Sequence, residues 1–361
     1  MEKAAKSKEM DMLNGGIAGK LILFAIPLAF SSILQQLFNS ADVAVVGRFA
    51  GDTALAAVGS CVALVGIFVN LIVGLSVGPN AALATLIGQK KREQINDMLH
   101  TILTFGAVLG LLLMCLGMLS ARVILELSGT PESVMSQALL YIRIYFLSIP
   151  FMVIYNFGSA ILRSFGDSRR PDEFQFRFRD MKIEKNALKK VLAIGIPAGI
   201  QGAIFSVSNV FIQSGINSFG ENAIAGSSLA LNFEYFTCDI ASAFAQTAVT
   251  FTSQNYGAGN VKRCKKVFWL CLLFGFGFTE ILAIVFMIWD DFFVSIYTTS
   301  SAVAVYGLIR MHHVCSLEGL TATYEVESSA LRGMGKSLEP SIITILGTVV
   351  FRLIWMVTVF K

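Results

Sequence analysis

Four acidic side chains lie within segments that are otherwise apolar, where a charged group needs a partner or contact with water. The segments are long enough to cross a membrane, and the four acids considered first are Asp42, Asp239, Glu318 and Glu325. A charge at bilayer depth costs roughly 2.5–3.5 kcal/mol on insertion scales, so it usually faces a cavity or a partner. In a cavity, such a carboxylate attracts a proton, a metal cation or an organic cation, and one can displace another.

Asp42 ends a polar stripe in the first apolar segment. The spacing i, i+4, i+8 and i+11 places side chains on one face of a helix, and it is the spacing of Ser31, Gln35, Asn39 and Asp42. One interpretation is a cavity-lining face on which Asp42 accepts a proton or a cation. The other is that Asp42 lies near the outer end of the helix and merely pairs with Arg48.

Glu325 belongs to a second polar face. Residues at i, i+3, i+7 and i+10 share a helix face, and these are Glu318, Thr321, Glu325 and Ser328. Glu327 points elsewhere and has a simpler interpretation as a partner of Arg332. We predict that Asp42 and Glu325 bind the coupling ion or proton.

Two more stripes either line a cavity or form hydrogen bonds between helices, which are usually modest in energy. They are Ser206, Asn209, Gln213 and Asn217, and then Asp239, Ser242, Gln246 and Thr250. From all these faces we predict a set of substrate-binding residues: Gln35, Asn39, Asn156, Asn209, Gln213, Asp239, Gln246 and Tyr324.

Other chemistry has no pattern to support it. The six cysteines and three histidines form neither C-x-x-C nor H-E-x-x-H spacing, and the adjacent His312 and His313 point in different directions on a helix. The sequence has no Walker motif and no convincing Ser–His or paired-carboxylate arrangement at close spacing. We therefore expect no metal site, no cofactor, no ATP drive and no enzymatic activity.

Composition places the chain in a membrane. It is 55% hydrophobic and only 14% charged, with a mean hydropathy of +0.69, whereas a soluble domain needs a charged surface. A span needs about 20 apolar residues. Nine candidates follow: 18–47, 53–80, 97–125, 133–164, 188–218, 223–254, 264–297, 301–331 and 338–360. No cleavable segment precedes Leu21, so the first helix is expected to be an uncleaved anchor.

The chain also repeats itself. Ser159–Pro171 reappears as Ser328–Pro340, at an offset of 169 residues. Upstream, the register holds within one residue for Pro27 and Pro197, Asn39 and Asn209, Gly88 and Gly257, and Tyr155 and Tyr324. Two copies of one multi-helix unit are a transporter architecture, with the binding site between the halves. The counterpart of Glu325 is Asn156, so this position is acidic only in the second copy.

Basic residues gather at every second connection, beginning before the first span. The positive-inside rule then predicts a cytoplasmic N-terminus, a cell (inner) membrane protein, and an external Lys361. The spans that begin at 18 and 188 both start inside, so the repeats are parallel and their pseudo-twofold axis follows the membrane normal. We predict an N-terminal lobe (1–171), a charged cytoplasmic linker (172–187) and a C-terminal lobe (188–361).

The repeat also indicates missing segments. An apolar span follows Pro340, but a charged stretch follows the equivalent Pro171. The basic residues around 163–190 stay on one side only if an even number of helices is missing, so a missing pair fits both observations. The end at Lys361, directly after a span, suggests that a last helix is missing too.

Four stretches together are specific to one family: Ile26–Phe30 (IPLAF), Phe38–Phe49 (FNSADVAVVGRF), Val249–Gly259 (VTFTSQNYGAG) and Ala330–Gly335 (ALRGMG). With these the chain resembles multidrug and toxic compound extrusion (MATE) transporters of the bacterial DNA-damage-inducible branch. The resemblance implies two six-helix lobes, of which helices five, six and twelve are lacking here. It links Asp42 to proton coupling, with its usual aspartate partner on the lacking helix six. It also matches Glu325 to a glutamate that many of these transporters carry.

The function expected from these observations is secondary active export, in which a proton or sodium ion is exchanged for an amphipathic, often cationic, organic compound. The partners are the lipid bilayer and the small organic substrate, with no nucleic acid, and we expect a monomer. One alternative is a flippase of lipid-linked sugars with a related fold. Another is an inactive fragment without a function of its own.

Overall fold

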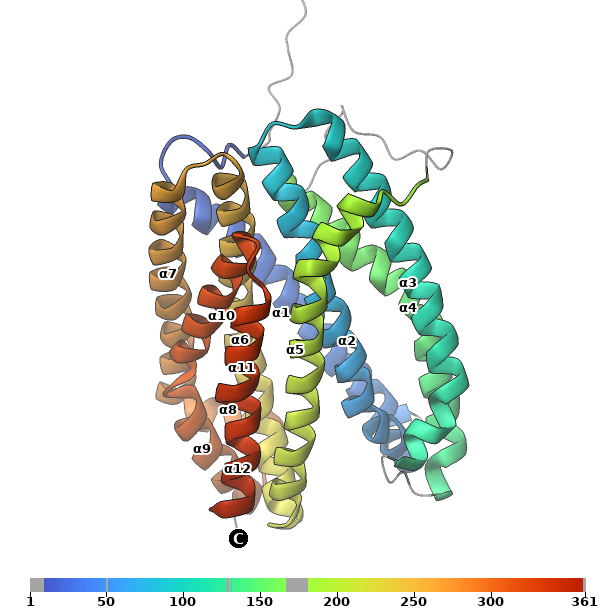
Figure 1. Ribbon diagram of the computed structural model, residues 1–361. Helices are drawn as coiled ribbons and strands as arrows, with labels where there is room; N and C mark the ends of the chain where they lie inside the picture. The colour runs from blue at the N-terminus through green and yellow to red at the C-terminus, as the bar shows by residue number, and fades with distance from the viewer. Residues whose placement is uncertain (1–9, 50, 128–129, 131, 167–180, 360–361) are drawn as a thin grey trace, which may run out of the picture.

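The computed structural model describes residues 10–49, 51–127, 130, 132–166 and 181–359, apart from the side chains of residues 39–60, 63 and 133. This part of the chain consists of helices joined by short connections (Figure 1). They are α1 (Ala18–Phe49), α2 (Gly51–Gly88), α3 (Arg92–Leu127), α4 (Glu132–Phe165), α5 (Lys185–Asn217), α6 (Glu221–Gly257), α7 (Val261–Ile288), α8 (Asp290–Tyr297), α9 (Ser301–Cys315), α10 (Glu318–Gly333), α11 (Leu338–Thr344), the π-helical turn η2 (Ile345–Val350) and α12 (Phe351–Thr358).

Seven stretches of the described residues are long and apolar enough to cross a membrane. They lie in α1, α2, α3, α4, α5 and α7, and in the continuous rod from α11 to α12. The predicted spans over 223–254 and 301–331 are not among them. Helix α6 carries many polar residues, and the predicted single helix over 301–331 is wrong, because the chain breaks into α9 and α10 at Ser316 and Leu317.

The charged linker predicted over 172–187 lies mostly outside the described residues, and its last three residues already belong to α5. The Glu184 carboxylate starts this helix, since it accepts hydrogen bonds from the backbone N–H groups of Asn186 (3.0 Å) and Ala187 (2.5 Å). Such an N-cap satisfies two of the donors that a helix start leaves unpaired.

The turns repeat with the sequence. Lys90 and Gly259, at the same offset of 169, have φ angles of 57° and 75° after the second helix of each half. Gly166 and Gly335 share this offset, with φ angles of 75° and 84° at the next pair of turns. Left-handed backbone favours glycine, so Lys90 adopts the conformation that the second half gives to a glycine.

The two halves cross where α2 meets α6, through reciprocal contacts. A Cβ atom on Gly88 would lie 2.0 Å from the Gln254 carbonyl oxygen, and one on Gly257 would lie 2.2 Å from that of Thr85. The offset of 169 exchanges these two contacts with each other. Likewise α5 packs along α2, and α1 packs on α6. This exchange of partners is what a twofold relation between halves requires.

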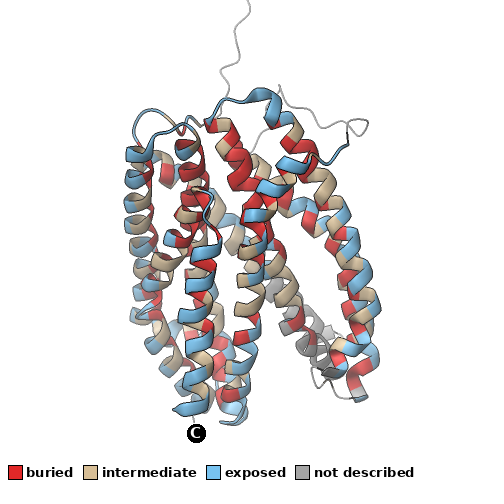
Figure 2. Ribbon diagram, in the orientation of Figure 1, coloured by how far each residue is buried: buried red, intermediate tan, exposed pale blue. Residues whose placement is uncertain are grey.

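The outer faces are apolar, and the basic turns share one end. In Figure 1 the connections α2–α3 and α6–α7 lie at the upper end, where α1 and α5 also begin, and the α10–α11 connection lies below them in the upper half. Large apolar side chains point outward, including Leu119 (83% exposed) and Phe151 (78% exposed), while buried residues face the inside of the bundle (Figure 2). Such faces suit acyl chains as their solvent.

Close backbone packing of α2 leads to a stability prediction. A Cβ on Gly78 would lie 2.2 Å from the Val191 carbonyl oxygen, but one on Gly66, in the same helix, would meet nothing within 4 Å. We expect Gly78→Ala to lower the free energy of unfolding by roughly 1–3 kcal/mol through overpacking. Gly66→Ala is the matched control and should be neutral. Thermal unfolding of the purified variants in detergent measures this, and equal midpoints for the two variants would contradict the packing.

Candidate functional site

Acidic side chains line the contact between α6 and α10. The Cys238 thiol donates a hydrogen bond to the Glu318 carboxylate (3.0 Å), and the Ser242 hydroxyl donates one to the Glu325 carboxylate (3.1 Å). Cys238 and Ser242 are one turn apart on α6, and the two glutamates are two turns apart on α10. The α6–α10 contact therefore carries two acid–donor pairs in a row, with Asp239 between the two donors in sequence.

A third glutamate holds the break between α9 and α10. The Glu280 carboxylate of α7 accepts a hydrogen bond from the backbone N–H of Gly319 (3.0 Å), in the first turn of α10. A helix that begins inside a membrane has backbone donors that water does not reach, and Glu280 satisfies one of them. Gly319 is needed here because a Cβ would lie 2.6 Å from the Glu280 oxygen and 2.9 Å from the ring of Phe276.

These acids have no cationic partner among the described residues. None of Asp239, Glu318 and Glu325 forms an ion pair there. Asp239 and Glu318 lie close enough to Glu325 to repel a negative charge on it, while Arg332, two turns along α10, attracts it. Arg332 is itself buried and donates a hydrogen bond to the Gln201 side chain (2.5 Å). A cluster of unpaired carboxylates at this depth fits a proton or a cation.

Glu234 is different, because it is fully paired. Its two carboxylate oxygens accept from the Arg310 guanidinium at 2.6 and 2.8 Å, and Arg310 also donates to the Ser227 hydroxyl. Removing one partner of such a buried pair usually destabilises a protein strongly. This ion pair therefore fastens α9 to α6, next to the cluster, rather than binding a mobile ion.

The structure brings together only some of the residues predicted to form the site. Asp239 and Glu325 lie in the α6–α10 cluster, and Gln246 lies further along α6, one turn before Thr250. Thr250 and Asn80 exchange hydrogen bonds of 2.9 and 3.3 Å across the two halves. Gln246 thus stands beside the crossing of α2 and α6, between the acidic cluster and the first half.

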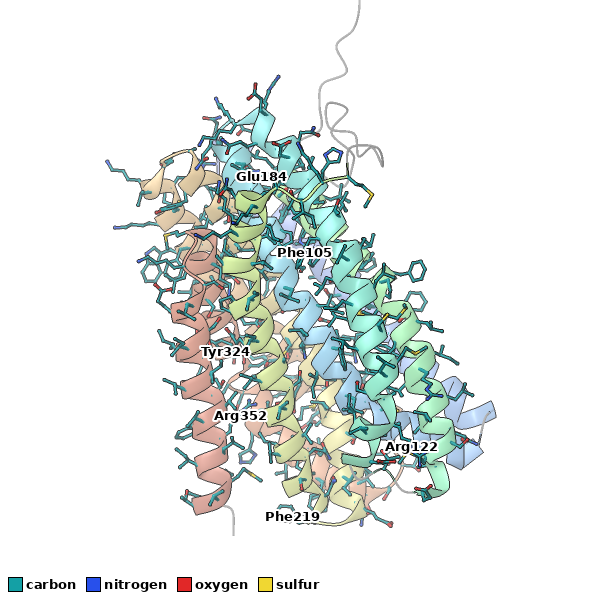
Figure 3. All side chains as sticks on the ribbon, turned by 45° about the vertical axis from the view of Figure 1, so that its right-hand side comes forward. Phe105, Arg122, Glu184, Phe219, Tyr324 and Arg352 are labelled. Carbon is teal, nitrogen blue, oxygen red and sulfur yellow. The ribbon has the colours of Figure 1, made fainter. Side chains whose placement is uncertain are left out.

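Asn209 and Gln213 of α5 lie elsewhere, on the side of α12, and Tyr324 of α10 lies between this side and the cluster. Asn209 accepts a hydrogen bond from Arg352 (3.0 Å), whose guanidinium also lies over the ring of Phe205 (4.9 Å). Gln213 donates to Asn217 of its own helix (2.9 Å). Tyr324 precedes Glu325 on α10 and lies on the side of Arg352, as Figure 3 shows. Asn209 and Gln213 are thus separate from the acidic cluster, whereas Tyr324 lies close to Glu325 and Glu318 as well as to Arg352.

The residues predicted in the first half do not reach the cluster through any described contact. Asn156 of α4 donates to the Met152 carbonyl in its own helix (2.9 Å), and Gln35 is exposed on α1. Asn39 and Asp42 belong to the α1 backbone, but their side chains lie outside the described residues. The ion-binding role of Asp42 therefore stays a prediction.

Sequence reasoning missed Glu280, Arg310 and Arg332 as parts of this region. Each is a charged residue inside or at the end of a predicted span, which is the signal that singled out Asp239 and Glu325. Their partners could not be recognised, because Glu280 and Gly319, or Glu234 and Arg310, come from different helices.

Comparison with known proteins identifies the family. The sequence matches the MatE family over residues 27–171 and 197–358, once in each half. It is 24% identical over 383 positions to the probable multidrug resistance protein YoeA of Bacillus subtilis (strain 168), covering 90% of this chain and 82% of that protein. It is 21% identical over 384 positions to the probable multidrug resistance protein NorM of Thermotoga maritima, covering 91% and 82%.

A solved structure shares the fold. The outward-facing conformation of a multidrug resistance MATE family transporter of the MOP superfamily matches with a TM-score of 0.87. The match covers 95% of this chain and 88% of that chain, at 20% identity, which is evidence for the fold alone. Because the family match extends over both halves, this protein belongs to the MatE family of membrane transporters and is not an enzyme.

Proposed function

We propose that the protein is a secondary active multidrug exporter, which exchanges an inward-moving proton or sodium ion for an amphipathic, often cationic, organic compound. The observation that carries this proposal is the cluster of Asp239, Glu318 and Glu325, which lack a cationic partner among the described residues. A carboxylate attracts either the coupling ion or the organic cation. Since both cannot neutralise it at once, binding of one favours release of the other.

Exchange also requires the site to face each side of the membrane in turn. In transporters built from two repeats, rocking of one half against the other around a fixed site provides this. Here the acids belong to the second half, and α2 of the first half lies against α5 and α6. We propose a monomer in the cell (inner) membrane with a cytoplasmic N-terminus, in which movement along α2 opens and closes the cluster.

We further propose that the chain belongs to the DNA-damage-inducible branch and lacks the family helices five and six. The alignment with YoeA extends over 383 positions, more than the 361 residues of this chain, although it covers only 90% of them. The relative therefore has additional residues inside the matched range. The additional residues support a missing pair of helices, which the internal repeat assigns to the stretch after Pro171.

Two alternatives remain to be separated from this proposal. A flippase of lipid-linked sugars would need basic residues in its cavity to hold pyrophosphate, whereas the α6–α10 cluster is acidic. An inactive fragment would carry the cluster without transport. Dye efflux from cells or vesicles containing this chain, beside the complete relative YoeA, distinguishes them: efflux by YoeA alone supports the inactive fragment.

The acidic cluster generates the first functional prediction. Glu325→Gln removes the charge but keeps the size and the hydrogen bond from Ser242, so we expect a loss of coupled efflux of at least tenfold at unchanged membrane abundance, which is about 1.4 kcal/mol or more. Glu327→Gln is the matched control, since Glu327 is exposed on the same helix two residues away. Efflux of a cationic dye such as ethidium measures both variants, at several pH values and sodium concentrations.

Normal efflux by Glu325→Gln would remove this residue from the mechanism and point to Asp239 or Glu318. Asp42→Asn, in the same assay, tests the predicted acid of the first half. If Asp42 merely pairs with Arg48, then Arg48→Ala should do comparable damage. A sodium dependence that disappears only in the acid variants would identify the coupling ion as sodium, and a pH dependence that disappears would identify it as the proton.

The proposed topology predicts a labelling pattern. Single cysteines introduced at Lys91 and Lys265, in or next to basic turns, should be shielded from an impermeant thiol reagent added outside intact cells. Cysteines at Asn222 and Ser300, at the opposite ends of the helices, should react. The parent protein gives the background from its own cysteines, and rapid external labelling at Lys91 would overturn the orientation.

A further inference from the structure

A basic groove lies where the segment before α1 crosses the start of α7. This segment passes over the upper end of α7 in Figure 1. The groove is a cavity of about 510 Å³, and its lining includes Gly15, Gly16, Lys262, Lys266 and Leu270. It lies at the end of the molecule that carries the basic turns, and its lining includes no residue of the acidic cluster.

Arg263 holds the backbone wall of the groove in place, because its guanidinium binds backbone carbonyl groups. Its guanidinium donates hydrogen bonds to the backbone carbonyls of Met12 (3.2 Å), Gly15 (2.9 Å) and Asn14 (3.1 Å). The neighbouring Lys262 and Lys266 are exposed, and neither has an ion pair with a described residue. The groove therefore has a fixed backbone wall and two ammonium groups that pair with no carboxylate of the described residues.

The equivalent place in the first half shows what is unusual here. The offset of 169 relates Lys262 and Lys266 to Glu93 and Asp97 at the start of α3. In that half the segment before α5 supplies Lys182, which pairs with Asp97 at 2.6 Å. The buried residues keep the same register on the two helices: Ile95, Met98 and Ile102 on α3, and Cys264, Val267 and Cys271 on α7. At the offset of 170 that relates α1 to α5, the position equivalent to Lys182 is Met12. The second half therefore has the lysine on the helix and no acid at the matching position of the segment before α1.

A second difference is that a carboxylate of the first half, Glu184, has no acidic counterpart beside the groove. Glu184 caps α5, and its hydrogen bonds from the N–H groups of Asn186 and Ala187 lower the pKa of this carboxyl. At the offset of 170, the equivalent residue before α1 is Asn14, which carries no charge. Asp11 is the nearest acid in the described segment, and it is occupied by the backbone N–H groups of Leu13 (2.9 Å) and Asn14 (3.0 Å). The two halves are built alike here, but among the described residues Asp97 has an ionic partner and the equivalent Lys266 has none.

We propose that this groove binds the phosphate group of an anionic phospholipid. Ammonium groups suit phosphate, and basic residues next to an anionic membrane surface contribute favourably to lipid binding. The apolar side of the groove is Leu270, and Trp269 beside it is 63% exposed, at the level where α7 enters its apolar stretch. Aromatic side chains favour this headgroup level. A free phosphate ion shares the polar contacts but not the apolar wall, so the groove favours a lipid.

The test compares lipids on the purified full chain in detergent. We expect phosphatidylglycerol to raise the unfolding temperature and to remain bound in native mass spectrometry, more than phosphatidylcholine or inorganic phosphate does. The double variant Lys262→Gln and Lys266→Gln should weaken phosphatidylglycerol binding roughly 10- to 30-fold, from about 1 kcal/mol per basic residue near the headgroups. The matched control is Lys189→Gln with Lys190→Gln, two exposed lysines at the same end of the molecule.

A second variant replaces one lysine of the groove by an acid. Leu13→Lys with Lys266→Asp places a lysine on the segment before α1 and an acid on α7, the order of charges that Lys182 and Asp97 have in the first half. It should lose the preference for phosphatidylglycerol while keeping the unfolding temperature of the lipid-free parent. Equal loss of binding in the Lys189 and Lys190 control would contradict a specific site in the groove, because general surface charge would then explain the binding. Equal stabilisation by inorganic phosphate would overturn the lipid as its ligand, as would no lipid preference at all.

Discussion

The backbones of α2 and α5 touch along a row of glycines, and this contact sets the geometry of the whole protein. Gly74 and Gly78 of α2 face Gly195 and Gly199 of α5, and in each case a Cβ would lie within 3 Å of the opposite helix. In a membrane the hydrophobic effect does not drive helices together, so close van der Waals packing between small residues must do so. Asn70 and Ser206 add a hydrogen bond of 2.7 Å to this contact.

This contact also positions the acidic cluster. Because α2 is fixed against α5, its continuation from Asn80 to Gly88 lies across α6. Helix α6 then presents Cys238, Asp239 and Ser242 to α10 on its other side. A short α10, started by Glu280 at the break, brings Glu318 and Glu325 to the same place. The acids of the cluster are thus positioned by a chain of contacts that begins at glycines with no chemistry of their own.

Much of the fold could be predicted from the sequence, because the internal repeat shows which helices of the two halves are equivalent. The register that relates Gly88 to Gly257 predicted equivalent helices, and the structure uses these two glycines in reciprocal contacts. The break at Ser316 and Leu317 was not accessible. The apolar pattern continues across it, and the group that compensates for it, Glu280, comes from another helix. The same limit applied to the site: periodicity placed Asp239 and Glu325 on polar faces but could not show that these faces meet.

Differences between equivalent residues of the two halves explain why the candidate binding residues lie in the second half. Asn156, equivalent to Glu325, satisfies its side chain within α4, while Glu325 reaches across to Ser242. Asp97 is neutralised by Lys182, but its equivalent Lys266 has no ionic partner among the described residues. In each pair the first half has a neutral or neutralised group, and the second half has a charge without an ionic partner in the part of the chain that the structure describes. A neutralised side chain holds helices together, whereas an open one needs something from outside, so the second half is where binding is expected.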